Sequence, residues 1–131
     1  MVTDKLKSFL QKEIEYYDAI SNKEITEFTN IYDYYYDTSK AKSIVNVCNE
    51  YLISLNSIDD ESEFVFKTKI RIGQKTNLLI EKRKEIQSEE SNVEIEIWYK
   101  EMGKINGYIH AETMIAVIVD EMDLELAKKI I

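Results

Sequence analysis

The sequence predicts an α+β fold in which an antiparallel sheet wraps around a central helix, with an added N-terminal helix and a short C-terminal helix. Apolar residues recur every three or four positions in residues 4–20 and 39–55, which is the spacing of a helix face. Apolar and polar residues alternate in residues 63–72 and 93–119, which is the spacing of a strand. A chain of 131 residues has the usual size of one domain, so we expect residues 1–131 to fold as a single unit.

The first helix is expected over residues 4–20, with Thr3 as a candidate N-cap. Its apolar face consists of Leu6, Phe9, Leu10, Ile14 and Tyr17.

The segment after this helix is ambiguous. Ser21 and Glu24 resemble the capping box of a helix. Alternation typical of a strand is formed by Phe28, Tyr32, Tyr34 and Tyr36. The aromatic and β-branched content favours a strand over residues 26–36.

A long central helix is expected from Ser39 onward, with Asp37 and Thr38 as candidate caps. Its narrow apolar stripe consists of Ala41, Ile44, Val45, Cys48, Leu52 and Leu55. Lys40, Asn46 and Glu50 fall on the opposite side, which predicts a helix with one buried face.

Four strands are expected after the central helix. Residues 63–72 alternate, and one face carries Phe64, Phe66, Thr68, Ile70 and Ile72. Residues 76–87 fit either a partly exposed strand or a helix. A hairpin is predicted from Val93 to Val119, with a turn at Gly103 and Asn106-Gly107. Asp120 then caps the short C-terminal helix.

This order of elements resembles the hot-dog fold of thioesterases over residues 26–120. The run from Phe64 to Gln74 is similar to the family's second strand leading into a glycine turn at Gly73. The resemblance implies a homodimer with a tunnel at the subunit boundary, which binds or hydrolyses an acyl thioester of coenzyme A or of acyl carrier protein.

Two carboxylates are candidate catalytic residues. The run Tyr36-Asp37-Thr38-Ser39 is similar to the Asp-Thr-Asp stretch of one acyl-CoA thioesterase branch, but Ser39 stands where the acting aspartate is expected. Asp37 would orient water for ester hydrolysis, or it simply caps the helix. Glu50 is the acid within the central helix, and as a charged residue opposite the apolar stripe it also fits a solvated position.

Lys82, Arg83 and Lys84 form a compact basic cluster that would bind the phosphates of coenzyme A or an acidic carrier protein. Because Glu81 and Glu85 flank them, a mixed solvated surface is the alternative. No Gly-rich phosphate loop is present, and we expect no cofactor.

Trp98 is predicted to lie at a homodimer contact, because the outer face of a strand leaves this ring exposed, and the alternative is an isolated surface tryptophan covered by the stems of neighbouring lysines. His110 is expected to be structural, and Cys48 is expected to be a buried, unreactive thiol. One cysteine and one histidine provide no set of ligands for a zinc site. The tyrosines at 32, 34, 35 and 36 fit either a ligand pocket or core packing.

The net charge of −8 disfavours direct contact with nucleic acid and suits a basic protein partner. It supports a second hypothesis, a non-enzymatic interaction protein such as an inhibitor, an immunity protein or a viral counter-defence factor that binds a basic or nucleic-acid-binding protein. The charged N-terminus and the short apolar runs predict a cytoplasmic protein without membrane contact.

Overall fold

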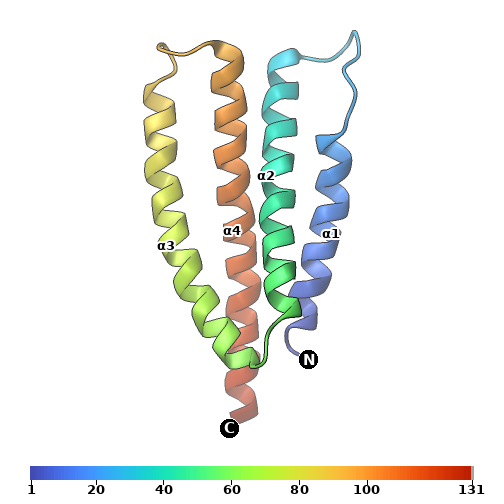
Figure 1. Cartoon of the computed structure of the whole chain (residues 1–131), viewed down its shortest axis with the longest axis vertical. Helices are drawn as coiled ribbons and strands as arrows, with labels where there is room; N and C mark the ends of the chain where they lie inside the picture. The colour runs from blue at the N-terminus through green and yellow to red at the C-terminus, as the bar shows by residue number, and fades with distance from the viewer. Residues whose placement is uncertain (131) are drawn as a thin grey trace.

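The computed structural model describes residues 1–130, and within them it contains four helices and no strand. They are α1 (Asp4–Ser21), α2 (Ile31–Asn56), α3 (Glu61–Ser88) and α4 (Ile95–Ile130). Successive helices run in opposite directions, and both chain ends lie near the α2–α3 connection (Figure 1). The predicted α+β class is therefore wrong, and the fold is an all-α bundle of four helices.

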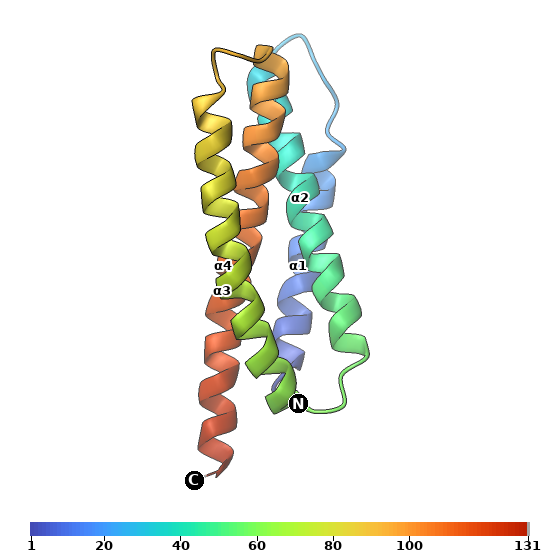
Figure 2. The same cartoon turned by 60° about the vertical axis from the view of Figure 1, so that its left-hand side comes forward.

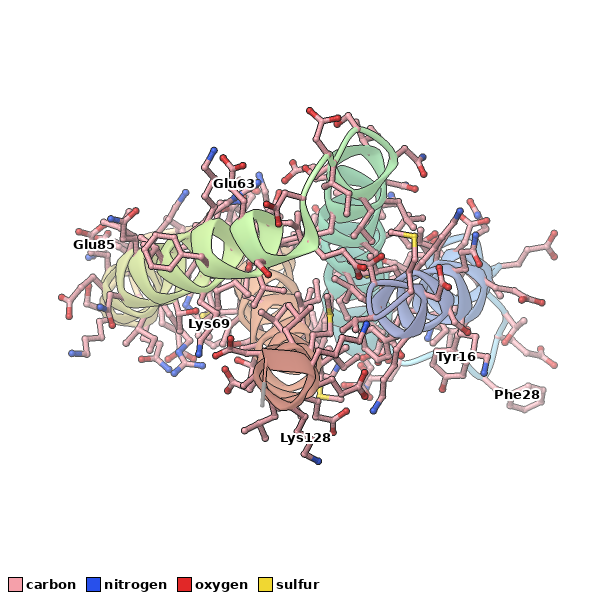
Figure 3. All side chains as sticks on the ribbon, turned by 90° about the horizontal axis from the view of Figure 1, so that it is seen from below. Tyr16, Phe28, Glu63, Lys69, Glu85 and Lys128 are labelled. Carbon is pink, nitrogen blue, oxygen red and sulfur yellow. The ribbon has the colours of Figure 1, made fainter. Side chains whose placement is uncertain are left out.

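The helices α2 and α4 form the central pair of the bundle. α1 packs on α2, α3 packs on α4, and α1 touches α4 over a small area. Within residues 1–130 the backbones of α2 and α3 do not come within 8 Å of each other, although these helices are consecutive. Figures 1 and 3 show α3 and α1 on opposite sides of the central pair, and Figure 2 shows α3 running alongside α4.

Local sequence signals explain where two of the helices begin. The Asn30 side chain accepts hydrogen bonds from the backbone N–H groups of Tyr32 (3.0 Å) and Asp33 (3.2 Å), so it caps α2. Asp60 caps α3 in the same way. Thr3 precedes α1 as expected, but its side chain makes no capping hydrogen bond. The chain has no proline, so nothing interrupts the long helices that follow these caps.

The core lies where α1, α2 and α4 meet, and it extends to the lower part of α3. The expected helix over residues 4–20 is confirmed, with Leu6 and Leu10 fully buried. The stripe predicted for the central helix is also confirmed in large part, because Ala41, Ile44, Cys48 and Leu55 are buried. α4 contributes Ile115, Val119 and Met122.

The predicted strand over residues 26–36 is wrong, because the chain forms a loop up to Asn30 and α2 begins at Ile31. Asp37 and Thr38 consequently lie inside α2 and do not cap it. Thr38 Oγ1 donates to the backbone carbonyl of Tyr34 (2.6 Å), which is a bond within the helix.

The predicted strand over residues 63–72 is also wrong, since the whole segment belongs to α3. A helical pattern coexists with the alternation: Phe64, Val65, Thr68 and Ile72 are buried. Phe66, which the strand pattern placed on their face, is 67% exposed. For residues 76–87 the helical alternative is the correct one.

The predicted hairpin from Val93 to Val119 and the separate C-terminal helix are wrong, because α4 runs without interruption from Ile95 to Ile130. Asp120 therefore lies inside a helix. Gly103 and Gly107 make no turn: a Cβ at Gly103 would collide with the carbonyl oxygen of Tyr36, and one at Gly107 with that of Lys40. The two glycines let α4 approach α2 closely.

The resemblance to the hot-dog fold is contradicted by this architecture. No sheet surrounds α2 in residues 1–130, and Gly73 lies in the middle of α3 and not in a turn. The predicted acyl-thioester function and the predicted tunnel between subunits both required that sheet, so the all-helical fold contradicts them.

Candidate functional site: a groove between α2 and α3

A groove follows α2, with α4 as its other wall at the upper end, α3 as its other wall at the lower end, and both helices lining it in the middle. It exists because α3 packs on α4 and its backbone stays away from α2. Three adjoining hollows of about 270, 330 and 170 Å³ follow one another from Ser39 to Ser54 of α2. Tyr108 lines the first two hollows. We call this feature the central groove.

A buried carboxylate lies at the floor of the central groove. Glu112 of α4 is 1% exposed, and its Oε2 accepts a hydrogen bond from Tyr51 Oη at 2.6 Å. Lys75 Nζ of α3 lies 3.6 Å from the other carboxylate oxygen. Side chains of α2, α3 and α4 thus converge on one acid, which satisfies the requirement that a buried charge be paired.

Glu50 connects the two walls of the groove. Its carboxylate lies 3.5 Å from Arg71 Nη2 and 3.8 Å from Lys75 Nζ, so α2 is tied to α3 by side chains alone. The Arg71 guanidinium also lies over the Tyr51 ring, 5.2 Å from its centroid. Glu50 is therefore a partner in an ion-pair network between α2 and α3.

Burial raises the pKa of the Tyr51 phenol, and its hydrogen bond to Glu112 raises the pKa further. The phenol consequently stays protonated and acts as a donor to the Glu112 carboxylate. The network has the chemistry of a fixed, polar floor that can bind the polar groups of a partner.

The walls of the central groove are rich in cations, although the chain has a net charge of −8. Its basic residues are Lys42, Lys67, Arg71, Lys75, Lys100 and Lys104. Its acids are Glu50, Glu101 and Glu112. Positive charge is thus concentrated in the central groove, whereas the protein as a whole carries an excess of negative charge.

Two of these cations lie at the upper part of the groove without an acidic partner. In the part of the chain that the structure describes, no carboxylate oxygen lies within 4 Å of Lys42 Nζ or Lys104 Nζ. Ser39, Ser43 and Asn46 surround them with groups that form hydrogen bonds. This end of the groove suits an anionic group.

The groove also offers apolar contact. Leu78 of α3 is 71% exposed at the middle hollow, where Val47, Leu79 and Tyr108 are further lining residues. An exposed leucine beside a partly apolar floor is typical of a surface that receives an apolar side chain.

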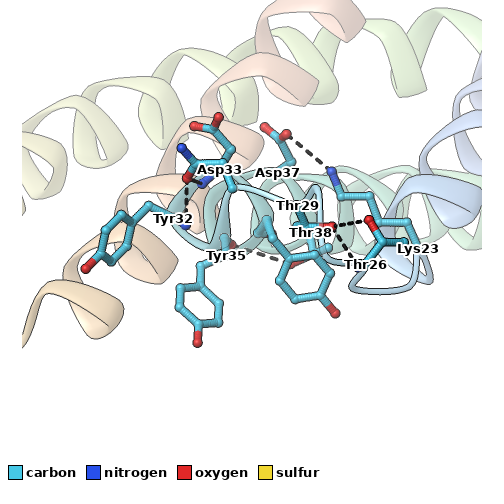
Figure 4. A network of polar contacts seen from close by, with 10 residues as sticks. Lys23, Thr26, Thr29, Tyr32, Asp33, Tyr35, Asp37 and Thr38 are labelled. Carbon is cyan, nitrogen blue, oxygen red and sulfur yellow. Dashed lines mark hydrogen bonds and ion pairs between the residues drawn. The ribbon is translucent and has the colours of Figure 1, made fainter.

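The two predicted catalytic residues do not share a site. Asp37 lies 13 positions before Glu50 in α2, which separates them by about 20 Å along the helix. Asp37 Oδ2 pairs with Lys23 Nζ at 3.5 Å, next to the loop that Thr26 and Thr29 stabilise (Figure 4). The two carboxylates therefore cannot act together on one ester carbonyl.

The predicted basic cluster is spread around α3. Arg83 Nη1 donates to Asn106 Oδ1 at 3.3 Å, whereas Lys84 pairs with Glu81 at 3.3 Å. Lys82 lines a different hollow, beside Trp98. Since neighbouring residues in a helix point about 100° apart, the three cations do not converge on one phosphate.

Trp98 lies in α4 and not on a sheet, so the surface on which its dimer role was based does not exist. Its ring is half-buried, and Nε1 donates to the carbonyl oxygen of Ile86 at 3.0 Å. Homodimer formation itself stays a prediction.

Cys48 lies in the interior of the bundle, and His110 is half-buried. His110 Nε2 lies 3.4 Å from Tyr17 Oη. Cys48 is buried, and burial raises the pKa of its thiol to about 12, which leaves it protonated at neutral pH.

Sequence reasoning missed Tyr51, Lys75 and Glu112. The available signal was Glu112 itself, because it interrupts a helical stripe formed by Tyr108, Ala111 and Ile115. That stripe is recognised only when residues 108–119 are treated as helical.

Within residues 1–130 no group of three or more histidine, cysteine, aspartate or glutamate side chains could hold a metal ion. No helix in the same range has a stretch long and apolar enough to cross a membrane. Comparison with known proteins adds no relative: no family model, no curated protein and no solved structure matches this chain.

Proposed function

We propose that this protein binds a partner protein, by receiving an amphipathic helix with an acidic face in the central groove. The observation that carries the proposal is the excess of cations along this groove in a chain whose net charge is −8. Charge of the opposite sign on the partner gives both specificity and a defined orientation.

The length of the groove suits a helix lying over it. From Ser39 to Ser54 it follows α2 for roughly 22 Å, the length of about four helical turns. α2 is one wall along this length, and the other wall is α4 at the upper hollow and α3 at the lower one, so a helix lying along α2 would contact both of these helices.

The two kinds of lining residue define the partner helix. Leu78 and Tyr108 favour a partner with an apolar stripe. A purely anionic ligand, such as a polyphosphate chain, has no apolar group to place against them. Lys42 and Lys104 favour acidic side chains beside that stripe. Repulsion from the acidic outer surface does not prevent binding, because charges more than about 8 Å apart are largely screened at physiological salt.

The test uses a fluorescein-labelled peptide of about 16 residues, with leucines along one face and glutamates on both sides of this apolar stripe. We expect saturable binding measured by fluorescence anisotropy, and weak binding of the same peptide with lysine in place of glutamate. Lys42→Glu/Lys104→Glu is expected to weaken binding by about tenfold or more, or roughly 1.4 kcal/mol.

The matched control is Lys7→Glu/Lys12→Glu, which makes the same change of charge at exposed positions on α1. It should bind the acidic peptide like the wild type. Absence of binding, or equal loss in the two double variants, would contradict the proposal.

A further inference from the structure

Another hollow lies between the end of α3 and the beginning of α4, and Glu101 lines both it and the upper end of the central groove. It has a volume of about 390 Å³, and its apolar lining is Ile86, Val93, Ile97 and Trp98. We call it the Trp98 pocket. Ile97 is 47% exposed and Val93 is 40% exposed, so the apolar wall is open to solvent.

The Trp98 pocket is held in shape by aromatic packing. Trp98 Nε1 donates to the carbonyl of Ile86, in the last turn of α3, which also accepts the backbone N–H of Glu89 at 3.1 Å, so the indole adds a second donor at this helix end. The indole also packs edge-on against Tyr99 at 5.3 Å between centroids, and Tyr99 stacks on Tyr32 at 5.1 Å. A fixed tryptophan in an open apolar hollow is a typical anchor point for a protein partner.

The charge around the Trp98 pocket is opposite to that of the central groove. Its rim carries Glu85, Glu89 and Glu101, against the single cation Lys82. The last turn of α3 contains no basic residue, so the negative end of its helix dipole remains uncompensated. An occupant of this pocket therefore gains from positive charge beside its apolar group.

We propose that the Trp98 pocket docks a basic segment of a partner protein, which inserts one large apolar side chain flanked by lysine or arginine. A second copy of this chain fits less well, because it brings the same acidic rim and two acidic surfaces repel each other. The proposal does not rest on the helix proposed for the central groove, although Glu101 lines both sites.

The chain contains a single tryptophan, so Trp98 itself reports occupancy. The probe is a tryptophan-free lysine-rich peptide with one central leucine. We expect a saturable change in Trp98 emission, and binding about tenfold weaker when glycine replaces that leucine. Ile97→Ser, a change at an exposed position, should weaken binding by a similar factor without unfolding the chain.

Charge is tested with Glu85→Lys/Glu89→Lys, for which we expect binding about tenfold weaker than that of the wild type. The control Glu27→Lys/Glu125→Lys changes the net charge equally at exposed positions outside the pocket and should retain binding. An unchanged emission, equal binding of the leucine and glycine peptides, or equal loss in both double variants would overturn the proposal. A dimer in sedimentation that Ile97→Ser abolishes would overturn it as well, since the occupant is then a second copy.

Discussion

At the scale of single residues, the floor of the central groove depends on how one buried carboxylate is satisfied. Glu112 has a 2.6 Å hydrogen bond from Tyr51 and a longer contact, 3.6 Å, to Lys75. If Tyr51 is removed, the Glu112 carboxylate stays buried but loses its nearest hydrogen-bond donor, and the free-energy cost of removing it from water is no longer offset. The contributions of Tyr51 and Glu112 to stability are therefore coupled.

The first prediction concerns this unit. Tyr51→Phe removes the phenol hydroxyl but keeps the ring, and we expect it to lower the free energy of unfolding by about 2–4 kcal/mol. Tyr51→Phe/Glu112→Leu removes both polar partners and should recover part of the loss. Urea denaturation followed by circular dichroism measures both. A double variant less stable than the single one would contradict this view of Glu112.

The second prediction concerns Cys48 and alkaline pH. Burial raises the pKa of its thiol from 9.0 to about 12. Below pH 9 the thiol is largely protonated in both the folded and the unfolded chain, so its ionisation does not change the free energy of unfolding. Between pH 9 and about 12 only the unfolded chain ionises, so we expect stability to fall by about 1.4 kcal/mol per pH unit from this group.

Urea denaturation from pH 8 to 10.5 checks this expectation, with Cys48→Ala as the comparison. The variant loses some packing at every pH, but its stability should fall less steeply above pH 9, because only Tyr51 and other alkaline groups remain. Parallel curves for the two proteins would show that Cys48 does not titrate in this way.

At the scale of helices, two glycines that both lie inside helices have different surroundings in the fold. Gly107 is where α4 meets α2, and a Cβ there has no room beside the Lys40 carbonyl. Gly73 lies on α3 with nothing within 4 Å of an added Cβ. The same substitution should therefore have effects of opposite sign.

The third prediction is that Gly107→Ala destabilises the protein by about 1–3 kcal/mol through overpacking, whereas Gly73→Ala stabilises it by about 0.5–1 kcal/mol through helix propensity. Thermal unfolding of the two variants beside the wild type is sufficient. A neutral or stabilising Gly107→Ala would mean that α2 and α4 do not approach as closely as described.

The helices also show what could be predicted from the sequence. α1 and most of α2 were predicted because their apolar stripes have a single period and lie on one face. In α3 the buried set is mixed with exposed apolar residues such as Phe66 and Ile70, so alternation dominated the pattern. In α4 the glycines suggested a turn, although their role is helix contact. The absence of proline was the signal that favoured long helices.

At the scale of the whole molecule, the order of packing determines where a partner can bind. α3 is attached through α4, so the space beside α2 stays open and collects cations, while the end of α3 collects acids. Net charge alone could not predict this, because a value of −8 says nothing about where the lysines lie.

The most direct test of this account is to map the acidic amphipathic peptide on the protein by changes in backbone amide NMR shifts. The account predicts that the largest changes lie along the central groove, in residues 39–54, 67–79 and 100–112. Few changes are expected on α1, which lies on the other side of the central pair. Changes concentrated on α1 or around the exposed Phe66, with the groove unaffected, would contradict it.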